Sequence, residues 1–279
     1  MTLRAAECFF RAADGALIYF DARDAHPAAR ANLLFVHGLG EHLSKYDQWL
    51  TYAAGRGYNV AAYDQRGHGR TPGKRGDFAF DDLVSDLGRF VEVVGDRWPA
   101  LPAVVVAHSL GALVTLRWLA AGAPPLVRGA VLSSPPLQIV EDVPWWKRRL
   151  FLTLARAAPR LSLPRRSVVE KLTADPQRIA AWRDDPLRHG RITPRAMVGI
   201  ATAMEAARAA PLEVGLPLLV LVAPEDAVVD AGAALAWAAE ASADISVVEL
   251  PGARHEILND LEREAVFERI CDWCDARTG

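Results

Sequence analysis

A serine at the end of a buried strand is the residue of this sequence best placed for nucleophilic chemistry. Residues 104–107 are apolar and predict a buried strand, and residues 112–120 predict a helix with one apolar face. Ser109 lies between them, so a tight strand-to-helix turn would hold its hydroxyl clear of the backbone. Such a turn needs small neighbours, which Ala107 and Gly111 supply, although the first position is normally glycine. A serine that only caps the helix is the alternative interpretation.

The serine needs two partners from elsewhere in the chain. A base must remove its proton, and a carboxylate must orient that base, in the chain order serine, acid, histidine. His255 follows the last predicted strand and is the only histidine in the last quarter of the chain, so it is the candidate base. The loop after the strand at 216–222 offers Glu225 and Asp226, and these residues alone leave the choice of acid open. Asp230 in the same loop is better explained as the N-cap of the next helix.

Attack on a carbonyl carbon also requires donors for the oxyanion that forms. Backbone N–H groups must already face the place where that charge develops. We expect one donor to be the N–H of Leu110, directly after the serine, and the other to be that of Leu39. Leu39 stands between Gly38 and Gly40 after the predicted strand at 32–36, where glycines let the backbone approach closely.

The other six histidines have structural explanations. They are expected to order the glycine loop (His37, His42), to pack in turns (His68, His108) or to lie at the surface (His26, His189). No pair of them has metal-ligand spacing on one helix face, so the sequence predicts neither a metal hydrolase nor a cofactor.

The elements that must position these groups alternate along the chain. A hairpin is expected from residues 7–11 and 17–22, followed by strands at 32–36, 59–63, 104–107, 128–134, 216–222 and 245–250 and helices at 45–56, 80–98, 112–120, 231–241 and 260–276. Nearly continuous apolar strands separated by helices predict an α/β fold, with a mostly parallel sheet covered on both faces.

Residues 137–211 interrupt this alternation. They contain helical pieces and prolines but no convincing strand. We therefore expect a helical cap inserted into a core made of residues 1–136 and 212–279, over the carboxyl ends of the strands.

Composition describes an ordinary globular protein. The 279 residues approach the upper limit for one hydrophobic core, and 51% of them are hydrophobic. The net charge of −2 gives no electrostatic reason to expect a nucleic-acid partner. Neither a signal-peptide pattern nor an uncharged apolar stretch of ~20 residues is visible, so a cytoplasmic location is expected.

Three cysteines do not form a disulfide framework. Cys8 stands alone, whereas Cys271 and Cys274 lie three residues apart in the last predicted helix. We interpret this pair as two small helix residues, with a redox or metal site as the alternative.

Five motifs in order carry a resemblance to a known family: residues 37–42, 64–69, 107–111, 224–226 and 252–255. With them the chain resembles the α/β-hydrolases, and more narrowly the monoacylglycerol lipase and lysophospholipase group, which includes serine aminopeptidase-like sequences. The resemblance covers nearly the whole chain, with further matches at 185–187 and 192–193 in the cap.

The resemblance implies a triad of Ser109, Asp226 and His255, with the N–H groups of Leu39 and Leu110 as the oxyanion hole. It implies cofactor-free hydrolysis of carboxylic esters, with monoacylglycerols or lysophospholipid-like lipids as the favoured substrates. The alternatives are a short-chain carboxylesterase or thioesterase, an aminopeptidase and, from another class, a non-catalytic ligand receptor. Epoxide and haloalkane hydrolases of this fold use aspartate where this chain has Ser109.

One stretch of the cap does not align with that group. Residues 143–156 combine large apolar side chains, including Trp145 and Trp146, with a basic cluster. Two interpretations stay open: the apolar residues pack onto the body of the protein, or they contact a lipid surface transiently. The sequence predicts no oligomeric state.

Overall fold

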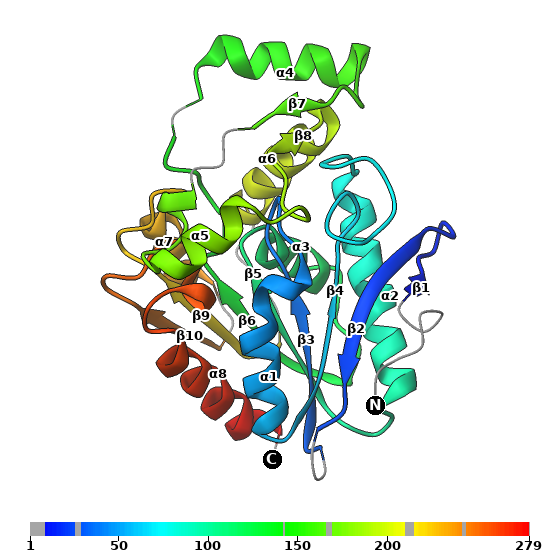
Figure 1. Ribbon diagram of the computed structural model, residues 1–279, viewed down its shortest axis with the longest axis vertical. Helices are drawn as coiled ribbons and strands as arrows, with labels where there is room; N and C mark the ends of the chain where they lie inside the picture. Colours follow the sequence, from blue (N-terminus) through cyan, green and yellow to red (C-terminus); the bar gives the residue numbers. More distant parts are fainter. Residues whose placement is uncertain are drawn as a thin grey trace.

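An eight-stranded sheet forms the centre of the computed structural model, which describes residues 9–25, 29–141, 143–165, 169–209, 215–241 and 244–278. The strand order is β1-β2-β4-β3-β5-β6-β9-β10 (Figure 1). Neighbouring strands from β4 to β10 are parallel, and β1 and β2 add an antiparallel hairpin at one edge.

The sheet strands and the helices that cover them keep the predicted alternation. The strands are β1 (Phe9–Arg11), β2 (Leu17–Arg23), β3 (Ala31–Val36), β4 (Tyr58–Tyr63), β5 (Ala103–His108), β6 (Val127–Ser133), β9 (Leu218–Val222) and β10 (Ile245–Glu249). The helices are η2 (Leu43–Tyr46), α1 (Asp47–Gly55), α2 (Phe80–Arg97), α3 (Leu110–Leu119), α7 (Ala231–Glu240), η4 (Ile257–Asn259) and α8 (Arg263–Thr278).

The central strands are buried on both faces. Every residue of β3, β4 and β5 is buried, and successive side chains of a strand point to opposite faces. In β3, Leu34 contributes to the cluster under α2, α3 and α7, whereas Leu33 contributes to the cluster under α1 and α8. Figure 1 shows the helices on both sides of the sheet. The predicted α/β architecture with a mostly parallel sheet is therefore confirmed.

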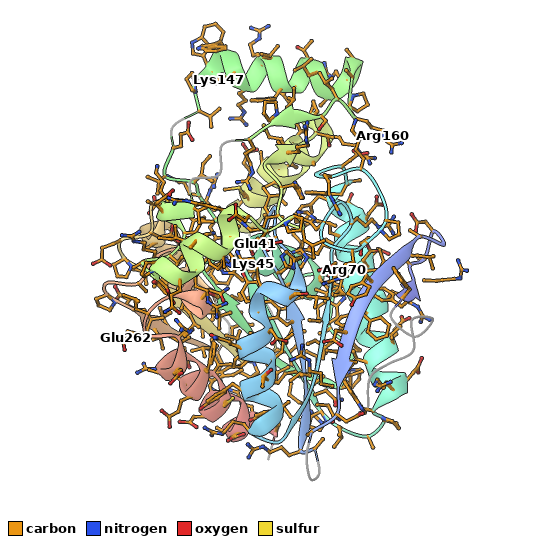
Figure 2. The ribbon with its side chains drawn as sticks, in the orientation of Figure 1. Glu41, Lys45, Arg70, Lys147, Arg160 and Glu262 are labelled. Atoms are coloured by element: carbon orange, nitrogen blue, oxygen red, sulfur yellow. The ribbon has the colours of Figure 1, made fainter. Side chains whose placement is uncertain are left out.

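Between β6 and β9 the chain forms a separate set of elements. They are α4 (Trp145–Ala157), β7 (Leu163–Pro164), η3 (Val169–Lys171), α5 (Pro176–Arg183), β8 (Arg191–Ile192) and α6 (Pro194–Ala209). They lie over one end of the sheet, with α4 outermost, and Figure 2 shows Lys147 of α4 at the far edge of the molecule. Ala196 and Met204 of α6 nevertheless join the main hydrophobic cluster, so this helix packs directly onto the body.

The expectation that this segment contains no strand is wrong in one detail. Strands β7 and β8 pair antiparallel through Leu163–Ile192 and Pro164–Arg191. Each has two residues, which is too short to produce a periodic pattern.

Some expectations concern residues outside the described ranges. These are Cys8, His26, the start of the first hairpin at residue 7 and the cap boundary at 211/212. Within the described ranges, no helix combines the length and apolar character needed to cross a bilayer.

Candidate active site

Ser109 occupies the tight turn that its neighbours predict. It lies between β5 and α3 with φ +49° and ψ −118°, a left-handed conformation that is costly for a residue with a side chain. A Cβ on Gly111 would collide with the carbonyl oxygen of Val36, so the close approach of helix and strand requires glycine there. Ala107 is fully buried in the core. Its methyl group is accommodated where glycine is usual.

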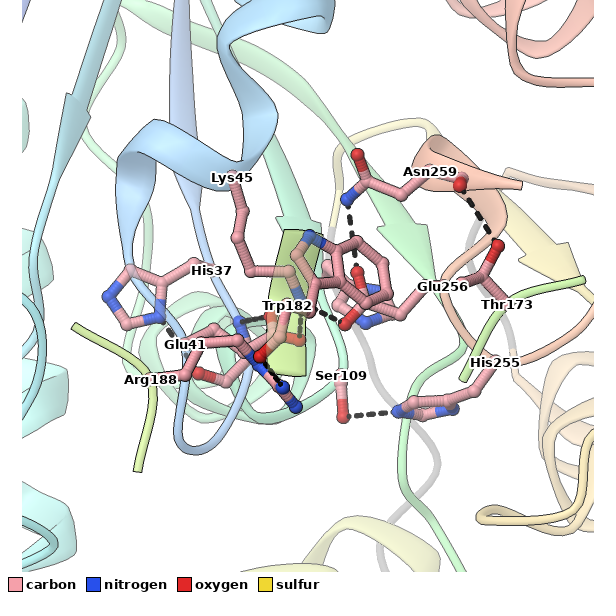
Figure 3. Close-up of polar contacts among 12 residues, drawn as sticks. His37, Glu41, Lys45, Ser109, Thr173, Trp182, Arg188, His255, Glu256 and Asn259 are labelled. Atoms are coloured by element: carbon pink, nitrogen blue, oxygen red, sulfur yellow. Dashed lines mark hydrogen bonds and ion pairs between the residues drawn. The ribbon is translucent and has the colours of Figure 1, made fainter. Parts of the chain in front are cut away.

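The structure brings together three residues from separate loops. His255 Nε2 lies 3.0 Å from Ser109 Oγ, and His255 Nδ1 lies 2.7 Å from Asp226 Oδ2. Figure 3 shows the contact between Ser109 and His255. The backbone oxygen of His255 also accepts a hydrogen bond from Ser134 Oγ at 2.8 Å, which fixes the loop that carries the imidazole.

Asp226 is held as a carboxylate. Its side chain is 1% exposed, and Oδ1 accepts hydrogen bonds from the N–H groups of Val228 at 2.7 Å and Val229 at 3.2 Å. Burial opposes ionisation, but the hydrogen bond from His255 and these two amides lower the pKa of Asp226 below its usual value. The carboxylate therefore stays charged at neutral pH and can stabilise a protonated imidazole.

The two other acids of this loop, Glu225 and Asp230, make contacts away from His255. Glu225 is exposed and accepts a hydrogen bond from the N–H of Gly252 at 3.0 Å. Asp230 caps α7 by accepting from the N–H of Ala233 at 3.3 Å, as the sequence predicted. Of the two acids that the sequence left open, the structure places only Asp226 against His255.

The glycine loop lies beside the serine. A Cβ on Gly38 would lie 3.2 Å from Ser109 Cβ, and Gly40 has φ +81°, so both positions suit glycine. Leu39 lies between them, and its carbonyl oxygen accepts a hydrogen bond from Arg165 Nη2 at 3.2 Å. Leu110 is the first residue of α3, where N–H groups have no partner within the helix. The role of Leu39 and Leu110 as oxyanion donors stays a prediction.

The other described histidines are mostly buried and tied into loops. His37 accepts a hydrogen bond from the N–H of Gln65 at 3.0 Å, whereas His42 contacts Asp185 of the 137–211 segment at 2.7 Å rather than its own loop. The expectation that His189 is exposed is wrong, since it is partly buried and its ring lies 4.9 Å from that of His68, centre to centre. Burial lowers the pKa of His189 to about 4 and that of His108 to about 3, so both are neutral at pH 7.

The two described cysteines do not form a reactive pair. Cys271 and Cys274 are free thiols buried in α8. Burial raises the pKa of Cys271 to about 12, which disfavours the thiolate that redox chemistry and metal binding require.

Sequence reasoning missed a buried ionic cluster next to the serine. It consists of Glu41, Lys45, Tyr46 and Glu256, and Figure 3 shows three of them above Ser109. Glu41 and Glu256, together with His108, form the one group of possible metal ligands found among the described residues. The ammonium of Lys45 contacts both carboxylates, however, so a cation is already present. The one sequence signal that could have revealed this cluster is the acidic residue Glu256 directly after the candidate base His255.

This chain is similar to known proteins in both sequence and structure. Residues 27–262 match the model of the family described as serine aminopeptidase, S33. A monoacylglycerol lipase of Mycolicibacterium smegmatis is 28% identical over 95% of this chain and 95% of its own length. A phospholipase of Bacillus subtilis is 29% identical over 85% of this chain and 92% of its own. The crystal structure of Paleococcus ferrophilus monoacylglycerol lipase superposes with a TM-score of 0.85 at 28% identity, over 93% of this chain and 99% of that one.

Proposed function

This chain belongs to the serine aminopeptidase S33 family of α/β-hydrolases, and on that premise we propose that it hydrolyses the carboxylic ester of lipids with a single acyl chain. The observation that carries the proposal is the continuous contact from Asp226 through His255 to Ser109. Relatives named monoacylglycerol lipase and phospholipase support the substrate class.

The reaction proceeds in two steps. His255 Nε2 accepts the proton of Ser109 as the hydroxyl oxygen attacks the acyl carbon, and Asp226 stabilises the imidazolium that results. The N–H groups of Leu39 and Leu110 hold the oxyanion. His255 then protonates the departing alcohol, and the acyl group remains on the serine. In the second step His255 takes a proton from water as the water oxygen attacks the acyl carbon. His255 then returns that proton to Ser109 Oγ as the acyl–oxygen bond breaks, which releases the fatty acid and restores the serine hydroxyl.

Residues 137–211 act as the cap of this enzyme. Their elements lie over the end of the sheet that carries Ser109 (Figure 1), and Arg165 at the end of β7 contacts the loop of Leu39. An acyl chain beneath this cap would be removed from water, and each buried methylene contributes about 0.8 kcal/mol.

Acyl-chain length tests the lipid assignment. With p-nitrophenyl esters and monoacylglycerols of rising chain length, kcat/KM should increase about three- to fourfold per added methylene until the apolar site is filled. A monotonic fall beyond short chains would remove the lipase assignment and leave a short-chain esterase. Hydrolysis of thioesters or of aminoacyl amides in preference to oxygen esters would favour the thioesterase or aminopeptidase alternative.

Helix α4 is the part of the cap suited to a transient lipid contact. None of its residues is buried, and Trp145 and Trp146 are 73% and 52% exposed. The interpretation that both indoles pack onto the body is therefore not supported. Lys147 follows directly and Arg149 stands two residues further along, so the same helix offers cations to an anionic lipid surface.

Removing both indoles should weaken membrane binding. Inserting half of one indole, about 100 Å², contributes about 2 kcal/mol, so the Trp145→Ala/Trp146→Ala double variant should bind anionic vesicles at least about tenfold more weakly in cosedimentation. Its hydrolysis of a water-soluble ester should be unchanged within about twofold. Leu261→Ala, which removes an exposed leucine outside the cap, is the matched control. Equal vesicle binding by the double variant and this control would contradict the lipid contact.

We also propose that the protein works in the cytoplasm. Its free thiols Cys271 and Cys274 suit a reducing compartment.

A further inference from the structure

The cluster of Glu41, Lys45, Tyr46 and Glu256 has a hydrogen-bond pattern that needs an extra proton. Lys45 Nζ donates to Glu41 Oε1 at 2.6 Å and also to Glu256 Oε1. Tyr46 Oη lies 2.7 Å from Glu41 Oε2 and 3.2 Å from Glu256 Oε2. A phenol has one proton to donate, and the shorter contact takes it. The longer contact becomes a full hydrogen bond when Glu256 carries a proton and donates it to Tyr46 Oη.

The charges of the cluster lead to the same conclusion. The side chains of Glu41, Lys45 and Glu256 are 6%, 0% and 0% exposed. Two carboxylates and one ammonium leave one uncompensated negative charge, which is costly away from water. Burial and the charge of Glu41 raise the pKa of Glu256 to about 7. For Glu41, burial opposes ionisation, but the charge of Lys45 together with the neighbouring hydrogen-bond donors holds the pKa well below its usual value.

The cluster joins the segments that carry the reacting groups. Glu41 Oε2 accepts a hydrogen bond at 3.1 Å from the N–H of Gly38, the residue before Leu39. Glu256 directly follows His255, and its own N–H donates to the carbonyl oxygen of Leu172 in the 137–211 segment at 2.8 Å.

The cluster also contacts the cap. Lys45 Nζ lies 3.8 Å from the centre of the Trp182 ring in α5, and a cation at this distance is attracted to the ring. Figure 3 shows the two side chains next to each other. Asn259 Nδ2 donates to Glu256 Oε2 at 3.0 Å, which holds the carboxyl group from the side of η4.

We propose that Glu256 is a positioning residue whose protonated form, bonded to Tyr46 and through Tyr46 to Glu41, fixes the position of the His255 loop relative to the Leu39 loop. The role rests on the proposed function, because positioning has meaning only if these loops perform the hydrolysis. When Glu256 ionises, it repels Glu41, and Glu41 turns from the N–H of Gly38. The donor at Leu39 then moves away from the oxyanion. A second negative charge near that oxyanion opposes its formation as well.

The pH dependence has a defined sign. Groups that face Glu256 are Glu41, Lys45 and Tyr46 from the loop after β3 and from η2, His108 from the end of β5, and Arg178 from α5. Because the pKa of Glu256 is about 7, the protonated form prevails below that pH. Activity is therefore lost on the alkaline side, and kcat falls rather than KM rising, because the oxyanion forms only after substrate is bound.

The Glu256→Gln variant separates positioning from general structure. An amide donates like the protonated acid but cannot ionise, so the variant should lose the fall of kcat on the alkaline side. At about two pH units above neutrality, wild-type kcat should be at least about tenfold below its maximum. The kcat of the variant should stay within about threefold of the variant's own maximum. Glu262→Gln, an equal change at an exposed position (Figure 2), should reproduce the wild-type profile. Coincident profiles for wild type and Glu256→Gln would overturn the proposal.

A spectroscopic titration does not depend on turnover. In infrared difference spectra, the wild-type protein should lose the carbonyl stretch of one protonated carboxylic acid as the pH rises through about 7, and Glu256→Gln should lack that band. A wild-type protein that shows this band but hydrolyses no ester would contradict the proposed function, whereas the protonation of Glu256 would still be supported. Absence of the band in the wild type would contradict the proposed protonation of Glu256, whatever the activity.

Discussion

Replacing Ser109 with alanine is expected to lower kcat for ester hydrolysis by about 10⁵- to 10⁶-fold. Without the hydroxyl there is no nucleophile in contact with His255 Nε2, which lies 3.0 Å from Ser109 Oγ. The residual rate would come from oxyanion donors and substrate binding alone. Steady-state hydrolysis of a p-nitrophenyl ester measures the loss, and labelling by a fluorophosphonate probe should disappear with it.

The variant also has an internal control for folding. Ser109 is strained at φ +49°, and alanine meets a similar backbone cost, so the thermal unfolding midpoint should change little. Turnover that survives in a folded Ser109→Ala protein would show that another residue performs the attack.

Replacing Asp226 with asparagine is expected to lower kcat by about 10⁴-fold, whereas Glu225→Gln should change it by less than about twofold. The introduced amide could still accept hydrogen bonds from the N–H groups of Val228 and Val229 through its oxygen. Its NH₂ group would then face His255 Nδ1, which would place the imidazole proton on Nε2. In that tautomer the ring cannot accept the proton of Ser109.

These adjacent acids make a matched pair. Glu225 bonds only to the backbone of Gly252 among its described contacts, at the protein surface. Parallel kcat measurements on the two variants decide which carboxylate orients the base. A large loss in Glu225→Gln, with Asp226→Asn near wild type, would reverse the assignment.

The sheet was predictable because its signals are local. The apolar run of β5, the glycine after Ser109 and the helix that follows stand together in the sequence, and the structure places them as predicted. Strands β7 and β8 were not predictable, because two residues carry no period and their pairing joins Leu163 to Ile192 across the segment. Helix α4 shows both large apolar and basic residues, and only the structure shows that its indoles are exposed.

The candidate site, too, was predictable only in part. Ser109 and His255 follow from a motif and from the scarcity of histidines near the C-terminus. Asp226 could not be separated from Glu225 by local sequence, because the choice depends on which of two neighbouring side chains turns inward. Glu41 and Glu256 were not linked at all, since their shared contact with Lys45 joins residues more than two hundred positions apart.

Identification of the residue that carries the acyl group would test the proposed mechanism most directly. The reaction with a p-nitrophenyl ester is quenched in acid during the first turnover, and the digested protein is examined by peptide mass spectrometry. One acyl group on Ser109 is the predicted result. An acyl group on any other residue, or release of product at equal rates by the wild type and Ser109→Ala without any adduct, would contradict it.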